Sequence, residues 1–319
     1  MTMEIPERLI RLIRRETSRP APPPVRVLAR ALLARYGDAA LAILFYGSCF
    51  RKGDDAGGIV DLYLIVDSYP HAFRRSSHAF LNRLLPPNVF YLEVPYEGRV
   101  TRAKYAVFSM KDLRRGVSTD WFHSYLWGRL AQPAGIVYAR NARTAAAVHR
   151  ALARAVVTFV SRVLPVMPPR FRGIELWRKG LALSYGAELR SERGDRIDEL
   201  IGADPDRYAA AARFAMRAVP FPVAAAGGAS GTWYRTTIPA SRRMAGRIAW
   251  RVRSIQGKLL SVLRLVKGLF TFRNGLDYIL WKIERHSGIR VRVDPRLRRL
   301  PLVGTGLLFW RLYRRGAFR

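Results

Sequence analysis

A glycine and serine pair, followed by an aspartate in the next apolar run, is the part of the sequence best suited to phosphate chemistry. Gly47-Ser48 follow the run LAILFY, and Asp61 lies within the run IVDLYLIV. Glycine lets backbone N–H groups approach an anion closely, serine adds a hydroxyl donor, and a carboxylate on a neighbouring strand binds a divalent cation. The pattern indicates a site for a metal-bound triphosphate, with a plain hairpin and a buried aspartate as the alternative.

Asp61 needs a compensating partner if its strand is buried. An ionised carboxylate inside an apolar strand costs several kcal/mol unless it is paired or binds a metal. Nucleotidyltransferases of the polymerase-β type carry a second acid two residues later, where this chain has Tyr63. Asp67 keeps the parity of the strand, so we predict that Asp61 binds Mg²⁺ with Asp67 as the second ligand. Glu93, in the third apolar run, is a further candidate for the metal, with a structural salt bridge as its alternative role.

Cationic side chains further along the chain suit the same phosphate groups. Lys104 would place a point charge on a phosphate oxygen, and Arg129 would act as a forked donor to the triphosphate or to a second phosphate. Tyr185 and Arg190 share one predicted helix that we expect to reach the same cleft. The alternatives are a solvated charge for each cation and ordinary helix packing for Tyr185.

The elements that must position these residues are predicted from the apolar runs. Residues 41–46, 59–66, 89–94 and 103–110 have strand length and composition and are expected to form one sheet. Before them, residues 6–16 read as a short amphipathic helix, and a second helix ends near Tyr36-Gly37. Residues 111–217 have a mostly helical period, and the Ala/Gly/Pro stretch 220–231 reads as a linker or loop. The fold class is therefore α/β.

We divide the chain into four regions. They are a helical lead-in at 1–40, a nucleotidyltransferase domain at 41–140, a helical domain at 141–240 that could be winged-helix-like, and a basic amphipathic C-terminal region at 241–319.

The composition favours an anionic partner. The 319 residues include 56 Lys and Arg against 23 Asp and Glu, a formal charge of +33, and only seven of the basic residues are lysine. Arginine favours forked contacts with phosphate. No helix-turn-helix, zinc or aromatic-platform motif accompanies the charge, so we expect no nucleic acid partner. Cys49 is the only cysteine and the five histidines lack metal-ligand spacing, which disfavours a disulfide framework and a Cys or His nucleophile.

The C-terminal region concentrates the positive charge and two amphipathic segments. Residues 241–319 hold 20 Lys and Arg against three acids. Apolar residues at three- or four-residue spacing predict a basic amphipathic helix over 247–270, and the tail 302–319 has a short apolar face flanked by arginines. We expect the tail to lie on an anionic membrane surface, with packing as a final core helix as its alternative. No apolar run is long enough to span a bilayer, and no signal-peptide core follows Met1. We therefore expect a peripheral protein on the cytoplasmic face of the inner membrane.

Motifs in one order along the chain resemble a known family, the phosphatidate cytidylyltransferases of the mitochondrial translocator-maintenance type and their bacterial relatives. The matching residues are Tyr46-Gly47-Ser48-Cys49, Asp61 to Asp67, Lys104-Tyr105-Ala106-Val107, Trp121, Tyr125, Gly128-Arg129-Leu130, Pro133, Leu183-Ser184-Tyr185-Gly186, Leu189-Arg190, Arg264, Lys267-Gly268 and Thr271. Three features depart from the family pattern. Cys49 and Ala106 replace glycines, and the family's Trp-His after the acidic strand is not reproduced.

The resemblance implies a polymerase-β-type sheet and a Mg²⁺-dependent transfer of CMP from CTP to phosphatidate, which yields CDP-diacylglycerol and pyrophosphate. Asp61 and Lys104 would be catalytic. The nucleotide would contact Gly47, Ser48, Arg129, Tyr185, Arg190, Arg264 and Lys267. Two other hypotheses stay open: a nucleotidyltransferase with another phosphorylated or hydroxyl acceptor, and a noncatalytic basic protein that binds membranes or nucleic acid. The sequence assigns no oligomeric state.

Overall fold

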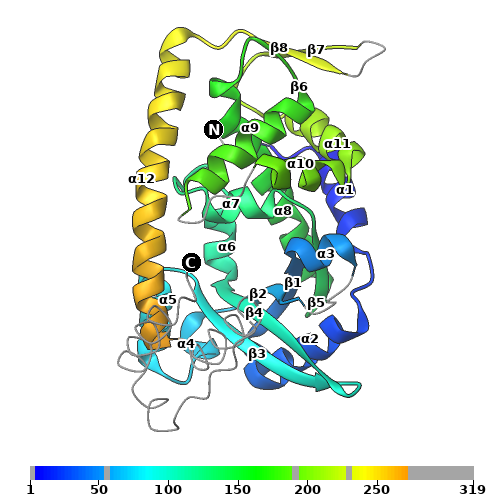
Figure 1. Cartoon of the computed structure of the whole chain (residues 1–319), viewed down its shortest axis with the longest axis vertical. Helices are drawn as coiled ribbons and strands as arrows, with labels where there is room; N and C mark the ends of the chain where they lie inside the picture. The colour runs from blue at the N-terminus through cyan, green and yellow to red at the C-terminus, as the bar shows by residue number, and fades with distance from the viewer. Residues whose placement is uncertain (1–3, 54–57, 189–193, 228–231, 272–319) are drawn as a thin grey trace, which may run out of the picture.

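A five-stranded mixed sheet forms the centre of the computed structural model, which describes residues 4–53, 58–188, 194–227 and 232–271 (Figure 1). Its strands are β1 (Ala40–Tyr46), β2 (Val60–Val66), β3 (Asn88–Tyr96), β4 (Arg99–Ser109) and β5 (Ala134–Ala139). Their spatial order is β3-β4-β2-β1-β5, with β2 and β4 parallel and the other neighbours antiparallel. The predicted α/β class and all four predicted strands are confirmed.

Both faces of the sheet are buried, as its nearly continuous apolar runs require. Tyr63 and Ile65 of β2 pack in one core with residues of three helices, α1 (Glu7–Thr17), α7 (Tyr125–Leu130) and α8 (Ala142–Val163). Leu62 and Leu64 point to the other face and belong to a second core, which includes residues of α2 (Pro23–Tyr36). Alternate residues of the central strand thus belong to different cores, and any side chain at a strand end keeps the face that its parity assigns.

Helices dominate the chain after the sheet. α9 (Gly173–Gly186), α10 (Gly194–Gly202) and α11 (Pro205–Ala215) follow α8, beside a small antiparallel sheet in the order β6 (Arg170–Arg172), β8 (Trp233–Thr236), β7 (Val223–Ala226). The short elements are η1 (Gly37–Ala39), α3 (Gly47–Lys52), α4 (Tyr69–Ala72), α5 (Ser76–Leu84), α6 (Met110–Gly116) and η2 (Leu164–Val166). One core joins Tyr63 to Val156 and Trp177, so it crosses the predicted boundary at residue 140.

Three strands lie where the sequence predicted other structure. β5 and β6 fall inside the region expected to be helical, and β7 falls inside the expected linker. β5 is the short apolar run AGIVYA, which has no polar alternation and which periodicity cannot distinguish from a buried helical segment. Pairing with β1 decides its conformation.

A buried ion pair ties the lead-in helix to the later helices. Arg207 of α11 donates from Nε to Oε2 of Glu16 in α1 over 2.7 Å, and both side chains are 4% exposed. The other oxygen of Glu16 accepts the N–H of Ala134 in β5 over 3.1 Å, while Arg207 also donates to the carbonyl of Ala131. The lead-in is therefore an integral part of the core.

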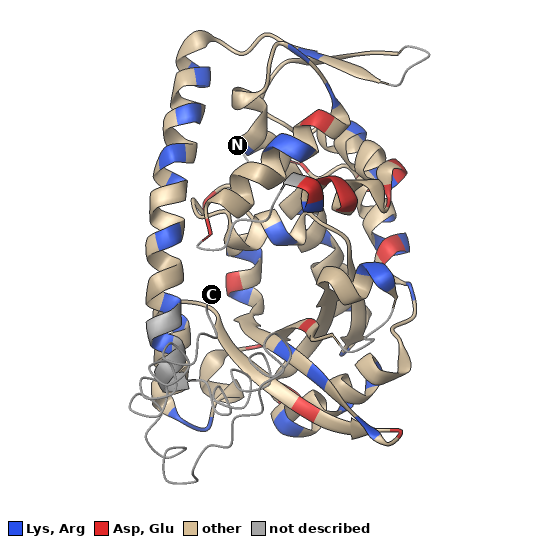
Figure 2. Cartoon of the chain, in the orientation of Figure 1, with Lys and Arg blue, Asp and Glu red and all other residues tan. Residues whose placement is uncertain are grey.

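A long helix, α12 (Ala240–Thr271), runs along one side of the molecule (Figure 1) and carries basic residues along its length (Figure 2). Trp250 donates to the carbonyl of Arg162 over 2.9 Å, and the buried Arg253 donates to the carbonyl of Phe122 over 2.8 Å. Seven other large apolar side chains of the helix instead face outward: Met244, Ile248, Val252, Ile255, Leu259, Val262 and Leu263 are exposed. We call these seven residues the α12 stripe.

The predicted amphipathic helix is thus present, with its apolar side away from the body of the protein. No described helix has both the length and the apolarity to cross a bilayer. The tail 302–319 lies outside the described residues.

Candidate functional site

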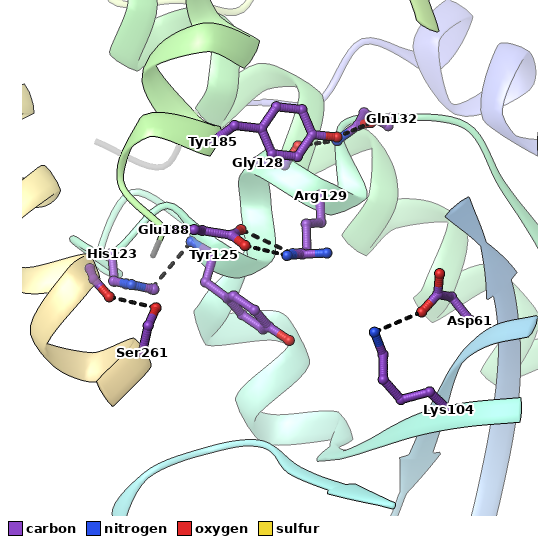
Figure 3. A network of polar contacts seen from close by, with 11 residues as sticks. Asp61, Lys104, His123, Tyr125, Gly128, Arg129, Gln132, Tyr185, Glu188 and Ser261 are labelled. Carbon is purple, nitrogen blue, oxygen red and sulfur yellow. Dashed lines mark hydrogen bonds and ion pairs between the residues drawn. The ribbon is translucent and has the colours of Figure 1, made fainter. Parts of the chain in front are cut away.

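Asp61 and Lys104 lie opposite each other on the parallel strands β2 and β4. Nζ of Lys104 is 3.1 Å from Oδ1 of Asp61, and the two side chains are 40% and 25% exposed (Figure 3). The ion pair supplies the compensation that a carboxylate at the end of a buried strand needs. The predicted catalytic pair is therefore brought together.

Gly47 begins α3 directly beside Asp61. Its φ is +84°, which glycine adopts without the steric cost of a Cβ atom. Tyr46, the residue before it, pairs with Asp61 across β1 and β2, and its side chain makes no capping bond to α3. The first backbone N–H groups of α3 and the Ser48 hydroxyl therefore lie at the edge of the sheet where Asp61 emerges.

The position of the missing second acid is filled by a buried ring. Tyr63 has no exposed surface and stacks on Tyr46 with ring centroids 4.3 Å apart and planes 8° apart. Burial raises the pKa of both phenols well above their usual range, so both stay neutral. The two stacked rings lie next to Asp61 and provide no second carboxylate.

Asp67 does not reach Asp61. It follows the far end of β2, six residues away, and a strand rises about 3.3 Å per residue. Oδ2 of Asp67 lies 2.7 Å from Nδ1 of His71, and Oδ1 accepts the N–H of Ser68. The prediction that Asp67 is a second metal ligand is therefore wrong. Strand parity assigns Asp61 and Asp67 to one face of the sheet, but the two residues lie at opposite ends of β2.

Glu93 forms a structural salt bridge, which was the alternative to its role as a metal ligand. Its carboxylate lies 2.9 Å from Nε of Arg102 and also accepts a hydrogen bond from the Tyr91 hydroxyl.

Arg129 is held from two sides. Its Nε donates to Oε1 of Glu188 over 3.2 Å and its Nη2 to Oε2, and its guanidinium lies 5.0 Å from the ring centroid of Tyr125. Burial lowers the pKa of Arg129, but the charge of Glu188 and the nearby Tyr125 outweigh that effect and raise it overall. Arg129 is therefore a permanent, oriented cation.

A pocket joins these groups. Its lining residues are Tyr46, Gly47, Ser48, Arg51, Asp61, Arg129, Gln132, Pro133, Tyr185, Glu188, Arg196 and Leu200. The predicted residues Gly47, Ser48, Asp61, Arg129 and Tyr185 thus share one cavity. The side chains of Arg51, Gln132, Glu188 and Arg196 were not predicted. Arg51 could have been predicted from the sequence, since it lies one helical turn after Ser48.

Tyr185 reaches the pocket from α9. Its hydroxyl donates to Oε1 of Gln132 over 3.0 Å, and Nε2 of Gln132 donates to the carbonyl of Gly128 over 3.1 Å. Arg190, predicted on the same helix, lies outside the described residues.

Arg264 and Lys267 lie on α12 and do not line the pocket described above. Arg264 stacks 4.5 Å from the ring centroid of Tyr125 and donates to the carbonyl of Pro86, while Lys267 donates to the carbonyls of Leu85 and Pro87. Burial, followed by the charge of Arg264, lowers the pKa of Lys267 to about 7. In this structure both residues hold α12 against the segment before β3, and their nucleotide contacts stay a prediction.

The pocket suits a metal that arrives with a substrate. Among the described residues, no three His, Cys, Asp or Glu side chains gather closely enough to hold an ion by themselves. Mg²⁺ is commonly bound through one or two carboxylates together with substrate phosphates. Asp61, a partly exposed carboxylate in a pocket lined by Arg51, Arg129 and Arg196, fits that mode.

A scan against protein-family models matched residues 70–200 to the family described as mitochondrial phosphatidate cytidylyltransferase. The chain resembles this family. The match includes Lys104, Arg129, Tyr185 and Glu188, and it supports assignment as a nucleotidyltransferase. A search of curated proteins found no significant match. Among solved structures, a nucleotidyltransferase-like protein from Exiguobacterium sibiricum matched with 11% identity over 92% of each chain and a TM-score of 0.26, below the range that indicates a common fold.

Proposed function

We propose that the protein is a phosphatidate cytidylyltransferase, which converts CTP and phosphatidate to CDP-diacylglycerol and pyrophosphate. The observation that carries the proposal is the single pocket in which Asp61, Gly47-Ser48 and Arg129 converge. This arrangement supports phosphoryl chemistry, and the matched family supplies the nucleotide and the lipid.

In the proposed reaction, the phosphate of phosphatidate attacks the α-phosphorus of CTP in line with the leaving pyrophosphate. Gly47 and Ser48 bind the β- and γ-phosphates, and Arg129 and Lys104 offset the charge that develops on them. Mg²⁺ bound through Asp61 would neutralise charge on the leaving group. Because the attacking phosphate is already ionised, positioning and charge neutralisation suffice and no strong general base is required.

The decisive experiment incubates the full chain with each nucleoside triphosphate, Mg²⁺ and phosphatidate, and detects products by mass spectrometry. We expect CDP-diacylglycerol and pyrophosphate with CTP only. Product with another triphosphate, or with a hydroxyl or different phosphate acceptor in place of phosphatidate, would support the alternative nucleotidyltransferase hypothesis. Absence of pyrophosphate with every pair would favour a noncatalytic binding protein.

We propose further that the enzyme works at an anionic membrane surface through the α12 stripe. The stripe groups seven exposed apolar side chains on one helix, with Arg247, Arg251 and Lys258 on the same helix. Apolar burial and attraction between cations and anionic headgroups reinforce each other at such a surface. The proposed location remains peripheral, on the cytoplasmic face of the inner membrane.

A further inference from the structure

Glu188 is a carboxylate in the wall of a pocket that we assign to a triphosphate, where a negative charge is out of place unless it serves a purpose. We propose that Glu188 is a positioning residue that orients the guanidinium of Arg129 toward the bound phosphates, an inference that rests on the proposed function.

The close packing of two helices brings this pair together. A Cβ atom on Gly128 would lie 2.1 Å from the Ser184 hydroxyl oxygen, so α7 and α9 approach as closely as they do only because residue 128 is glycine. Arg129 is the next residue on α7, and Glu188 lies one helical turn after Ser184. The two side chains meet across this contact although 59 residues separate them.

The geometry of the pair leaves part of Arg129 available. A guanidinium has five N–H donors, and Glu188 accepts one from Nε and one from Nη2. In Figure 3, Arg129 lies between Glu188 and the Asp61–Lys104 pair. The end of the guanidinium that Glu188 does not bind faces that pair. Glu188 therefore fixes one edge of the guanidinium and directs the other edge into the pocket.

Two further observations favour orientation over simple charge balance. Tyr125 supports the flat face of Arg129, so the ring and the carboxylate restrain different rotations of the side chain. Arg129 and Glu188 are 27% and 17% exposed, which limits exchange of the pair with water. A long arginine that is ordered before the ligand arrives loses less conformational entropy on binding.

The test measures the affinity of the full chain for inorganic triphosphate with Mg²⁺ by calorimetry. Glu188→Gln keeps the size of the side chain but removes its charge, and we expect it to weaken binding roughly tenfold or more. In an Arg129→Met background the same substitution should cause no further loss, because its effect acts through Arg129. Asp198→Asn is the matched control. It breaks the exposed 2.6 Å pair between Asp198 of α10 and Arg178 of α9, and we expect unchanged affinity.

Equal or tighter binding by Glu188→Gln would overturn the positioning role. An equal loss in both backgrounds would overturn it too, because a purely structural defect does not depend on Arg129. Thermal melts of all variants identify any that fail to fold. If Glu188→Gln fails to fold, Glu188→Asp, which retains the charge, replaces it, and we expect a smaller loss of triphosphate affinity. Triphosphate binding without CTP turnover would refute the proposed function while leaving the positioning role supported. Absence of triphosphate binding by the wild type would refute both.

Discussion

A Cβ atom on Gly47 would lie 2.8 Å from Oδ2 of Asp61 and 3.3 Å from its Cβ atom. The backbone of the proposed phosphate-binding turn and the candidate metal-binding carboxylate are thus in direct contact. The turn and the acid were separate elements of the sequence pattern, and this contact makes them one structural unit.

Gly47→Ala should therefore damage the site as well as the fold. The added methyl displaces Asp61, and alanine at a φ of +84° costs about 1–2 kcal/mol. We expect near-complete loss of CTP turnover with a modest fall in melting temperature. Gly53→Ala is the control, because Gly53 has a φ of +68° but no atom within 4 Å of its Cβ position. Similar activity losses in both variants would show that backbone strain alone is responsible.

Asp61→Asn should lower turnover at least about 100-fold, since it removes the carboxylate charge that would bind Mg²⁺ without changing side-chain volume. The same substitution at Asp67 should leave turnover unchanged, because Asp67 lies at the far end of β2. Ser48→Ala should be milder than Asp61→Asn, since the backbone N–H groups remain. Steady-state rates together with circular dichroism distinguish these outcomes, and retained activity in Asp61→Asn would remove that residue from the site.

Lys267 should make stability depend on pH. Its pKa falls from 10.5 to about 7 in the folded chain, so between these values the unfolded chain binds more protons. Stability therefore rises with pH across this interval and is lost as pH falls toward 7. We expect the melting temperature of the wild type, relative to Lys267→Met, to decrease from the alkaline to the neutral end. A constant difference between the two proteins would contradict this expectation.

The Glu16–Arg207 pair should be the most sensitive polar contact in the core. Glu16→Ala leaves a buried guanidinium unpaired and should reduce the free energy of unfolding by about 3–5 kcal/mol. Replacing both residues with methionine should restore much of that loss, because no unpaired charge remains. Chemical denaturation of the two variants measures the difference. Equal losses would mean that the packing of these side chains matters more than their charges.

The α12 stripe should govern association with anionic vesicles. Ile255→Asp combined with Leu259→Asp replaces two apolar side chains, which are 71% and 58% exposed, with negatively charged ones. Anionic headgroups repel these charges. We expect weaker sedimentation with phosphatidate-containing vesicles and an unchanged melting temperature. Val100→Asp is the control, because Val100 is 41% exposed and pairs with Pro95, at the opposite end of β3 from the segment that α12 contacts; this variant should sediment normally. Normal sedimentation of the double variant would direct attention to the residues after Thr271.

The sequence by itself determined four of the five strands of the central sheet, β1 to β4, and the turn that follows β1. Apolar runs of strand length are local signals, and burial on both faces makes them nearly continuous. The Gly-Ser pair and Asp61 were likewise visible, because a charged residue in an apolar run demands a partner. Lys104 and Arg129 were added through a resemblance between short motifs in the same order along the chain.

Only the tertiary structure decided which of the other candidates meet. Parity put Asp67 on the face of Asp61, but the length of β2 separates them. Periodicity predicted the two sides of α12, but the buried Trp250 and the hydrogen bonds of Arg253 turn the apolar side outward. Glu188 carried no signal of its own, since its role depends on the packing of Gly128 against Ser184. Sequence patterns describe distances along one element, whereas contacts between elements depend on how closely their surfaces pack.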